Sequence, residues 1–147
     1  MMLSKTCDYG IRAAIFVAGR KDQQFTPIGE ISEQLNISFH FLTKILQRLT
    51  QESILKSYRG SNGGVALARA AHLISLKDIV SAIDGDNPFG ACLLGLNQCS
   101  DHNPCPLHEQ WNLIRKKMES LFEKTTLAKL ATATTAKRFR LTDLTEP

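Results

Sequence analysis

The chain has 147 residues, of which 43% are hydrophobic and 22% are charged, enough for one hydrophobic core and an additional helix. Its longest apolar stretch, residues 11–18, is interrupted by Arg12 and is shorter than the roughly 20 residues that a membrane span needs. The sequence does not begin with a signal-peptide pattern. These features argue against a membrane protein, and we expect the chain to stay in the cytoplasm.

The positive charge is concentrated in one half of the chain. The net charge is +4; residues 1–70 contain nine Lys or Arg against five Asp or Glu, whereas residues 71–147 contain nine of each. Proteins bind nucleic acids largely by neutralising phosphates, so this distribution favours a nucleic-acid-binding surface in the N-terminal half. A basic surface without a partner is the alternative that charge alone leaves open.

Residues 4–51 predict three helices. Ser4 is placed to cap a first helix that ends near Gly19. Apolar residues at positions 28, 31 and 35 mark a short second helix, and Ser38 is placed to cap a third helix after a three-residue break. The third helix has an apolar face formed by Leu42, Ile45, Leu46 and Leu49. Its polar face carries His40, Thr43, Lys44, Gln47 and Arg48. The sequence therefore predicts that helices two and three form a helix-turn-helix, in which the polar face of helix three is free to contact DNA.

Two strand-like stretches, residues 54–59 and 65–68, follow the third helix. The five residues between them, 60–64, are Gly, Ser, Asn, Gly and Gly. A hairpin directly after a helix-turn-helix is a wing, and a tip of small residues lets Arg59 approach a phosphate or enter the minor groove. A surface hairpin without DNA contacts is the alternative. We therefore expect a mainly α fold with a small β-hairpin wing.

A fourth helix over residues 76–84 completes the predicted winged helix-turn-helix domain, residues 1–85. Ser75 and Asp78 have the spacing of a capping box, and Gly85 is suited to end the helix.

Residues 86–106 are predicted to form a loop that contains three of the four cysteines. The potential ligands are spaced Cys92-x6-Cys99-x5-Cys105-x2-His108. In a cytosolic protein, thiols and an imidazole at such spacing favour a metal over disulfide bonds. Zinc and iron–sulfur clusters both accept these donors, so a structural zinc site and a cluster remain open at this point.

A long amphipathic helix is predicted over residues 107–131. Its apolar positions recur three and four residues apart: Leu107, Trp111, Ile114, Met118, Leu121, Thr125 and Ala128. A chain of this size has little core left to cover such a stripe, so we expect the helix to pair with its copy in a second subunit. Residues 132–147 have little apolar pattern, and a mobile tail is expected there.

Together these features resemble the Rrf2 family of winged-helix transcription regulators, which includes IscR, NsrR and CymR. The resemblance reaches about residue 130. It rests on Asp8-Tyr9-Gly10-x-Arg12-Ala13, on the helix-turn-helix, on Arg59-Gly60-x-x-Gly63-Gly64, and on the three loop cysteines. It implies a homodimer on a partly palindromic double-stranded DNA operator, with helix three in the major groove and the wing in the minor groove. The DNA-binding candidates are Ser38, His40, Thr43, Lys44 and Arg48 on helix three, and Arg59, Gly60 and Ser61 on the wing.

The resemblance also implies that Cys92, Cys99 and Cys105 ligate an iron–sulfur cluster. It offers two fourth ligands: His108, which suggests a 2Fe–2S centre, or Asp8 reaching the partner subunit's cluster, which suggests a 4Fe–4S centre. We favour His108, because it is local in sequence and imidazole binds more tightly than a lone carboxylate. Cys7 fits neither pattern and is expected to be a small buried residue; a redox or ligand role is the alternative.

The sequence thus predicts a transcription regulator, most simply a repressor, that senses nitric oxide, redox state or iron supply through a cluster. One alternative keeps the DNA-binding dimer with a structural zinc or with a metal-free thiol switch, and another is an RNA-binding metal protein. An enzyme is not expected, because the sequence offers no nucleophile with a positioned base and no phosphate-cradling loop before a helix.

Overall fold

The computed structural model describes residues 3–20, 24–136 and 139–143 of the chain. Within these ranges the protein is mainly helical with one β-hairpin. The elements are α1 (Lys5–Ala18), α2 (Ile28–Leu35), α3 (Phe39–Gln51), β1 (Leu55–Tyr58), β2 (Gly64–Leu67), the 3-10 helix η1 (Ala71–Leu73), α4 (Leu76–Asp84), α5 (His108–Lys124) and α6 (Leu127–Thr135).

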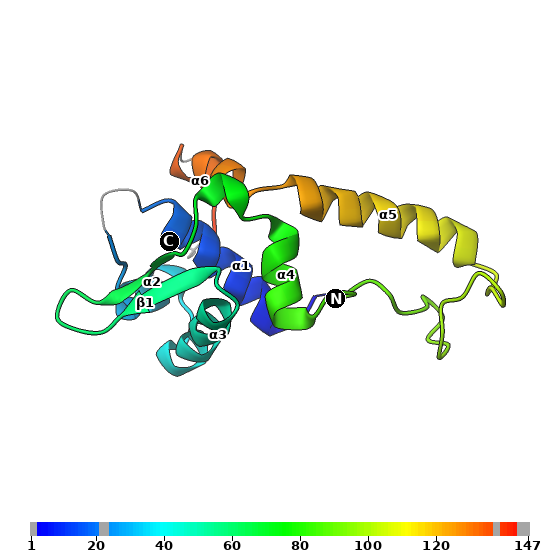
Figure 1. Cartoon of the computed structure of the whole chain (residues 1–147), viewed down its shortest axis with the longest axis horizontal. Helices are drawn as coiled ribbons and strands as arrows, with labels where there is room; N and C mark the ends of the chain where they lie inside the picture. Colours follow the sequence, from blue (N-terminus) through cyan, green and yellow to red (C-terminus); the bar gives the residue numbers. More distant parts are fainter. Residues whose placement is uncertain (1–2, 21–23, 137–138, 144–147) are drawn as a thin grey trace.

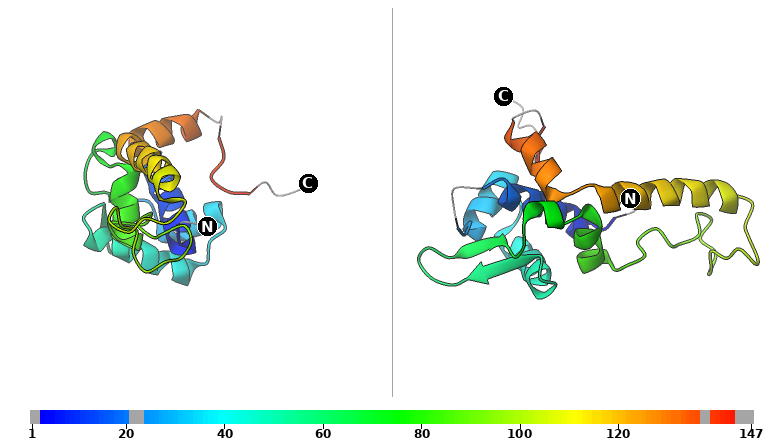
Figure 2. Two further views of the ribbon diagram at one scale, coloured as in Figure 1. Left: turned by 90° about the vertical axis from the view of Figure 1, so that its right-hand side faces the viewer. Right: turned by 45° about the horizontal axis from the view of Figure 1, so that its top comes forward.

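The molecule has two parts (Figure 1). The globular part contains α1 to α4, the hairpin and α6. The arm, residues 86–124, projects from it and consists of the cysteine loop, residues 86–106, followed by α5. In Figure 1 and in the right-hand view of Figure 2 the loop runs alongside α5, outside the globular part.

Helix α1 is the centre of the globular part, where it packs against α2, α3, α4, α6 and β2. It begins where the sequence predicted, because the Ser4 hydroxyl accepts a hydrogen bond from the backbone N–H of Cys7 at 3.0 Å. Small residues allow the close approach: a Cβ added to Gly10 would lie 2.3 Å from Cδ1 of Ile83 on α4. The core is thus built around one helix.

The helix-turn-helix has the predicted bounds. Helix α2 ends at Asn36, which adopts the left-handed conformation with φ 52°, and α3 begins two residues after Ile37. The four apolar residues of α3 named above are buried, as expected. The predicted capping role of Ser38 is wrong: this residue precedes α3, but its side chain makes no capping hydrogen bond.

The wing is a two-stranded antiparallel hairpin in which Leu55 pairs with Leu67 and Tyr58 pairs with Gly64. It is joined to the globular part by the segment before α2, since Thr26 and Val65 exchange backbone hydrogen bonds at 2.8 and 2.9 Å. Gly64 has φ 149°, and a Cβ there would lie 2.0 Å from the Thr26 carbonyl oxygen. Glycine is therefore required at this contact.

Helix α4 has the predicted capping box. The Asp78 N–H donates to the Ser75 hydroxyl at 3.1 Å, and the Ser75 N–H donates to the Asp78 carboxylate at 2.9 Å. The helix stops at Gly85, which has φ 92°.

Replacing Ser75 by alanine is expected to lower the free energy of unfolding by about 1 kcal/mol, because an orphan N–H of the first turn loses its acceptor. Urea denaturation followed by circular dichroism measures this loss. Ser81→Ala, inside the same helix, is the matched control and should cost less; an equal loss in the two variants would contradict the role of the cap.

The single helix predicted for residues 107–131 is wrong, because the chain forms two helices separated by Thr125 and Thr126. The backbone leaves the helix there to pair with the segment before α4. The Leu76 N–H donates to the Thr125 carbonyl at 2.8 Å, and the Leu127 N–H donates to the Ile74 carbonyl at 2.9 Å. Helix α6 then packs on α1 with Leu127 fully buried. The predicted stripe is therefore divided between α5, on the arm, and α6, in the core.

The prediction of a mobile tail over residues 132–147 is also wrong for part of that segment. Residues 132–135 belong to α6. Leu141 packs against the core, and its carbonyl accepts a hydrogen bond from Arg12 Nε at 2.5 Å. Residues 137–138 and 144–147 of the predicted tail lie outside the described residues. No described helix is both long and apolar enough to cross a bilayer.

Candidate nucleic-acid interface and metal centre

The predicted DNA-binding residues lie at or on α3 and on the wing, and three of the eight line the groove between these two elements. The exposed residues are Ser38, directly before α3, His40 and Lys44 on α3, and Arg59, Gly60 and Ser61 on the wing; Thr43 on α3 is half-buried. A groove of about 830 Å³ separates α3 from the hairpin, and Thr43, Arg59 and Gly60 are among the residues that line it. The structure therefore brings a helix surface and a basic wing together, as DNA binding by a winged helix requires.

Arg48 differs from the other candidates on α3. Its Nε donates a hydrogen bond to the Ala82 carbonyl oxygen at 2.9 Å, near the end of α4. The guanidinium thus satisfies a terminal carbonyl of α4 and joins this helix to α3. Arg48 has a structural role that the sequence pattern did not indicate.

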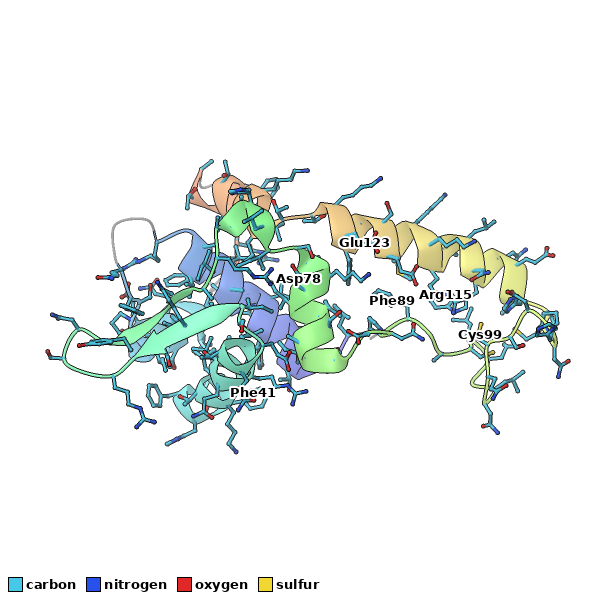
Figure 3. The ribbon with its side chains drawn as sticks, in the orientation of Figure 1. Phe41, Asp78, Phe89, Cys99, Arg115 and Glu123 are labelled. Carbon is cyan, nitrogen blue, oxygen red and sulfur yellow. The ribbon has the colours of Figure 1, made fainter. Side chains whose placement is uncertain are left out.

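The four ligand-type side chains of the arm form two pairs. Cys92 Sγ lies 3.8 Å from Cys105 Sγ, and Cys99 Sγ lies 3.4 Å from His108 Nδ1. Figure 3 shows Cys99 on the outer half of the arm, beyond Phe89 and Arg115. Within the described ranges, no three ligating side chains gather closely enough to hold one metal ion. The donors are present in two separate pairs.

His108 is held in a defined orientation at the start of α5. It is only 6% exposed, and its Nε2 lies 2.7 Å from Asp101 Oδ1. An ionised carboxylate can only accept, so Nε2–H is the donor in this contact, and the hydrogen bond lowers the pKa of Asp101. In the neutral imidazole, Nδ1 then carries the lone pair and faces Cys99. A carboxylate that orients a ligating histidine is common in metal sites, and the sequence pattern missed it because only ligand types were counted.

The arm is held together by packing between the cysteine loop and α5. The indole N–H of Trp111 donates to the Ala91 carbonyl at 3.1 Å, and the rings of Phe89 and Phe122 meet edge to face with centroids 5.2 Å apart. Hydrogen bonds from the backbone N–H groups of Leu96 and, to a smaller extent, Leu94 lower the pKa of the Cys92 thiol. The cysteines are thus part of an ordered structure.

Cys7 and Asp8 lie on α1, in the globular part, whereas Cys99 lies on the arm (Figure 3). Cys7 is completely buried, and burial, followed by the charges of Asp84 and Asp8, raises the pKa of its thiol to about 12. A protonated, buried thiol is a poor ligand and a poor nucleophile, which supports the predicted packing role. Asp8 is not brought to the loop cysteines within one chain.

One face of α5 is apolar and uncovered in the single chain. Leu113, Ile114 and Leu121 are 64%, 52% and 58% exposed. Ile114 and Leu121 belong to the stripe predicted from the sequence. Large apolar side chains at such exposure on one helix mark an interaction surface.

Comparison with known proteins identifies the family. The profile of the Rrf2 family, described as iron-dependent transcriptional regulators, matches residues 3–133. A protein of Aquifex aeolicus, named among the HTH-type transcriptional regulators, is 28% identical over 132 residues, which cover 88% of this chain and 91% of that protein.

Solved structures show the same fold. CymR (YrzC), the global cysteine regulator of B. subtilis, superimposes with a TM-score of 0.77 at 25% identity and covers 88% of this chain and 95% of its own. T. potens IscR has a TM-score of 0.73 at 20% identity and covers 94% of this chain and 91% of its own, a likeness of fold. These matches confirm the predicted mainly helical winged helix-turn-helix fold with its β-hairpin. The chain belongs to the Rrf2 family of transcriptional regulators and is not an enzyme.

Proposed function

We propose that this Rrf2 regulator is a homodimeric repressor whose affinity for double-stranded operator DNA depends on an iron–sulfur cluster in the arm. Its signal is nitric oxide, redox state or iron supply, and it acts in the cytoplasm. The observation that carries the proposal is the pairing of four soft donors on an arm attached to a DNA-binding globular part. The family match to transcriptional regulators favours duplex DNA over the RNA alternative.

The arrangement of donors favours a two-iron cluster with His108 as the fourth ligand. A tetrahedral zinc site gathers four donors around one ion, whereas a 2Fe–2S cluster takes two donors on each iron. The two contacting pairs, Cys92 with Cys105 and Cys99 with His108, match the second arrangement. When bound, the cluster would supply a centre that is sensitive to nitric oxide, oxygen and iron supply.

Helix α4 connects the cysteine loop to the recognition helix. The loop starts directly after Gly85, the residue that ends α4. Asp84, the last residue of α4, accepts hydrogen bonds from the Ser4 hydroxyl and, at 2.8 Å, from the Ser4 N–H. Two residues earlier, the Ala82 carbonyl accepts the hydrogen bond from Arg48 of α3. We infer that a change in loop conformation would act on the end of α4, which contacts both the start of α1 and α3. Through these contacts, ligand loss in the arm would alter DNA affinity.

The apolar face of α5 supports a homodimer built along the arms. A second copy of the same face would cover Leu113, Ile114 and Leu121, and a twofold axis would place two recognition helices on two operator half-sites.

Anaerobic purification followed by iron, zinc and sulfide analysis and a visible absorption spectrum tests the cluster. Two iron and two sulfide per chain, with a chromophore bleached by nitric oxide, would support the proposal. A content of one zinc per chain would indicate a structural metal site and would overturn the proposed sensing mechanism.

A metal-free thiol switch is the second candidate, and the 3.8 Å separation of the Cys92 and Cys105 sulfurs favours it. Oxidation by a peroxide would remove two electrons and two protons from these thiols and join them in a disulfide, with the peroxide reduced to water or alcohol. Protein without iron, in which peroxide produces a Cys92–Cys105 disulfide by mass spectrometry and changes operator affinity, would establish this candidate instead.

Replacing Arg59 by alanine is expected to weaken duplex binding and to reduce the slope of log K against log salt by about one per chain, because one phosphate contact is lost. Titration of labelled duplex at several salt concentrations measures both effects. Lys129→Ala removes the same charge from α6, which lies across the globular part from α3 (Figure 1), and should leave the slope unchanged. An unchanged slope for Arg59→Ala would remove the wing from the interface.

A further inference from the structure

Phe39 is the first residue of α3 and is 48% exposed, although it is a large apolar residue. Its ring contacts only the neighbouring His40 among the described aromatic rings, edge to face with centroids 5.9 Å apart. Phe41, two residues on, packs edge to face against Tyr9 of α1 at 5.6 Å. A contact with α1 therefore accounts for Phe41, which is 38% exposed, and no contact of this kind with another element accounts for Phe39 among the described aromatic rings.

Phe39 lies on the same groove as the predicted DNA contacts. It lines the groove between α3 and the wing together with Thr43, while Tyr58 and Arg59 line the groove from the wing. The Thr43 hydroxyl donates a hydrogen bond to the Phe39 carbonyl oxygen at 2.8 Å, so this donor is used within the helix. Thr43 retains a methyl group one turn from the Phe39 ring. The two side chains form an apolar patch on an otherwise polar helix face.

A DNA major groove offers one apolar group that matches such a patch. Base edges present hydrogen-bond donors and acceptors, and only thymine adds a 5-methyl group. Residues in the N-terminal part of a recognition helix are those that contact base edges. We propose that Phe39, supported by Thr43, contacts the 5-methyl group of a thymine in each operator half-site and thereby determines sequence specificity. This inference rests on the proposed binding of duplex DNA through α3.

Selection of duplexes from a random pool with the full-length, anaerobically purified protein gives the operator. A thymine is expected to be enriched at one position of each half-site, and Phe39→Ala should lose the preference at that position alone. Replacing this thymine by uracil, which lacks only the methyl group, should weaken wild-type binding about fourfold per half-site, the equivalent of about 0.8 kcal/mol for one buried methyl-sized group. Phe39→Ala should bind the thymine and uracil duplexes equally.

Phe139→Ala is the matched control, since Phe139 is an exposed aromatic residue that does not line the groove. It should keep the full thymine preference. Equal wild-type affinity for the thymine and uracil duplexes would overturn the inference. This holds even if Phe39→Ala binds both duplexes more weakly, because a ring inserted between base steps would give that result without contacting the methyl group. A fourfold preference retained by Phe39→Ala would also overturn it. Failure to select any duplex would instead overturn the proposed DNA binding through α3, and the inference with it.

Discussion

Replacing Cys99 by alanine is expected to abolish the visible absorbance of the anaerobically purified protein and to leave its fold intact. Cys99 is the cysteine paired with His108, so the variant lacks one of the four proposed ligands. The residue lies on the arm and is not part of the hydrophobic core, so the free energy of unfolding should change by less than about 0.5 kcal/mol. Iron and sulfide analysis, the visible spectrum and a urea denaturation curve measure the two effects.

Cys7→Ala is the control for this experiment, because it removes a thiol that lies in the core instead of the loop. It should keep the chromophore and lower the free energy of unfolding by about 1 kcal/mol, the usual cost of a small core truncation. The two variants therefore have opposite expected phenotypes. A chromophore that survives in Cys99→Ala, or that disappears in Cys7→Ala, would contradict the ligand assignment.

The second large effect is expected for Ile114→Glu on α5. A carboxylate in the centre of the proposed interface would be buried without a partner, which opposes association of two arms. The variant should sediment as a monomer at micromolar concentration. Operator affinity should fall on the order of 100-fold or more, because two linked recognition helices act as a bivalent ligand and a single one does not. Analytical ultracentrifugation and duplex titration measure the two quantities.

Glu119→Lys makes a larger change in charge at an exposed position of α5, on the side of the helix about 120° or more away from Leu113, Ile114 and Leu121. It should remain a dimer and should lose only the modest affinity that a general change in charge produces. If Ile114→Glu also remains a dimer, the apolar face of α5 is not the interface, and the proposed placement of the recognition helices is wrong.

The parts of the fold predicted correctly are those that local chemistry determines. The signals that begin and end α4 lie within the helix or next to it: the capping box of Ser75 and Asp78, and Gly85. Its bounds could therefore be predicted without knowledge of the tertiary structure. The apolar stripe of α3 likewise predicted its buried face. The family resemblance, in turn, rested on motifs spread along the chain, and the family match confirms it.

The errors arise where distant backbone segments meet. Apolar periodicity continues through Thr125 and Thr126, but hydrogen bonds to the chain before α4 end the helix there. Arg48 shares the polar face of α3 with the DNA-binding candidates, and only the approach of α4 gives its side chain a different partner. Asp101 was overlooked because its role depends on the position of the His108 ring. None of these contacts can be recognised from the spacing of residue types in the sequence.

The return of the chain from the arm to the globular part has a consequence for biosynthesis. Leu127 and Ala131 are buried core residues, yet they follow the arm in the sequence. A nascent chain that has emerged from the ribosome only as far as residue 120 therefore exposes the surface of α1 that α6 will cover. The globular part, which contains the helix-turn-helix, becomes complete only after the cysteine loop has been synthesised. Translation order thus disfavours a stable fragment that contains the recognition helix and lacks the cysteines.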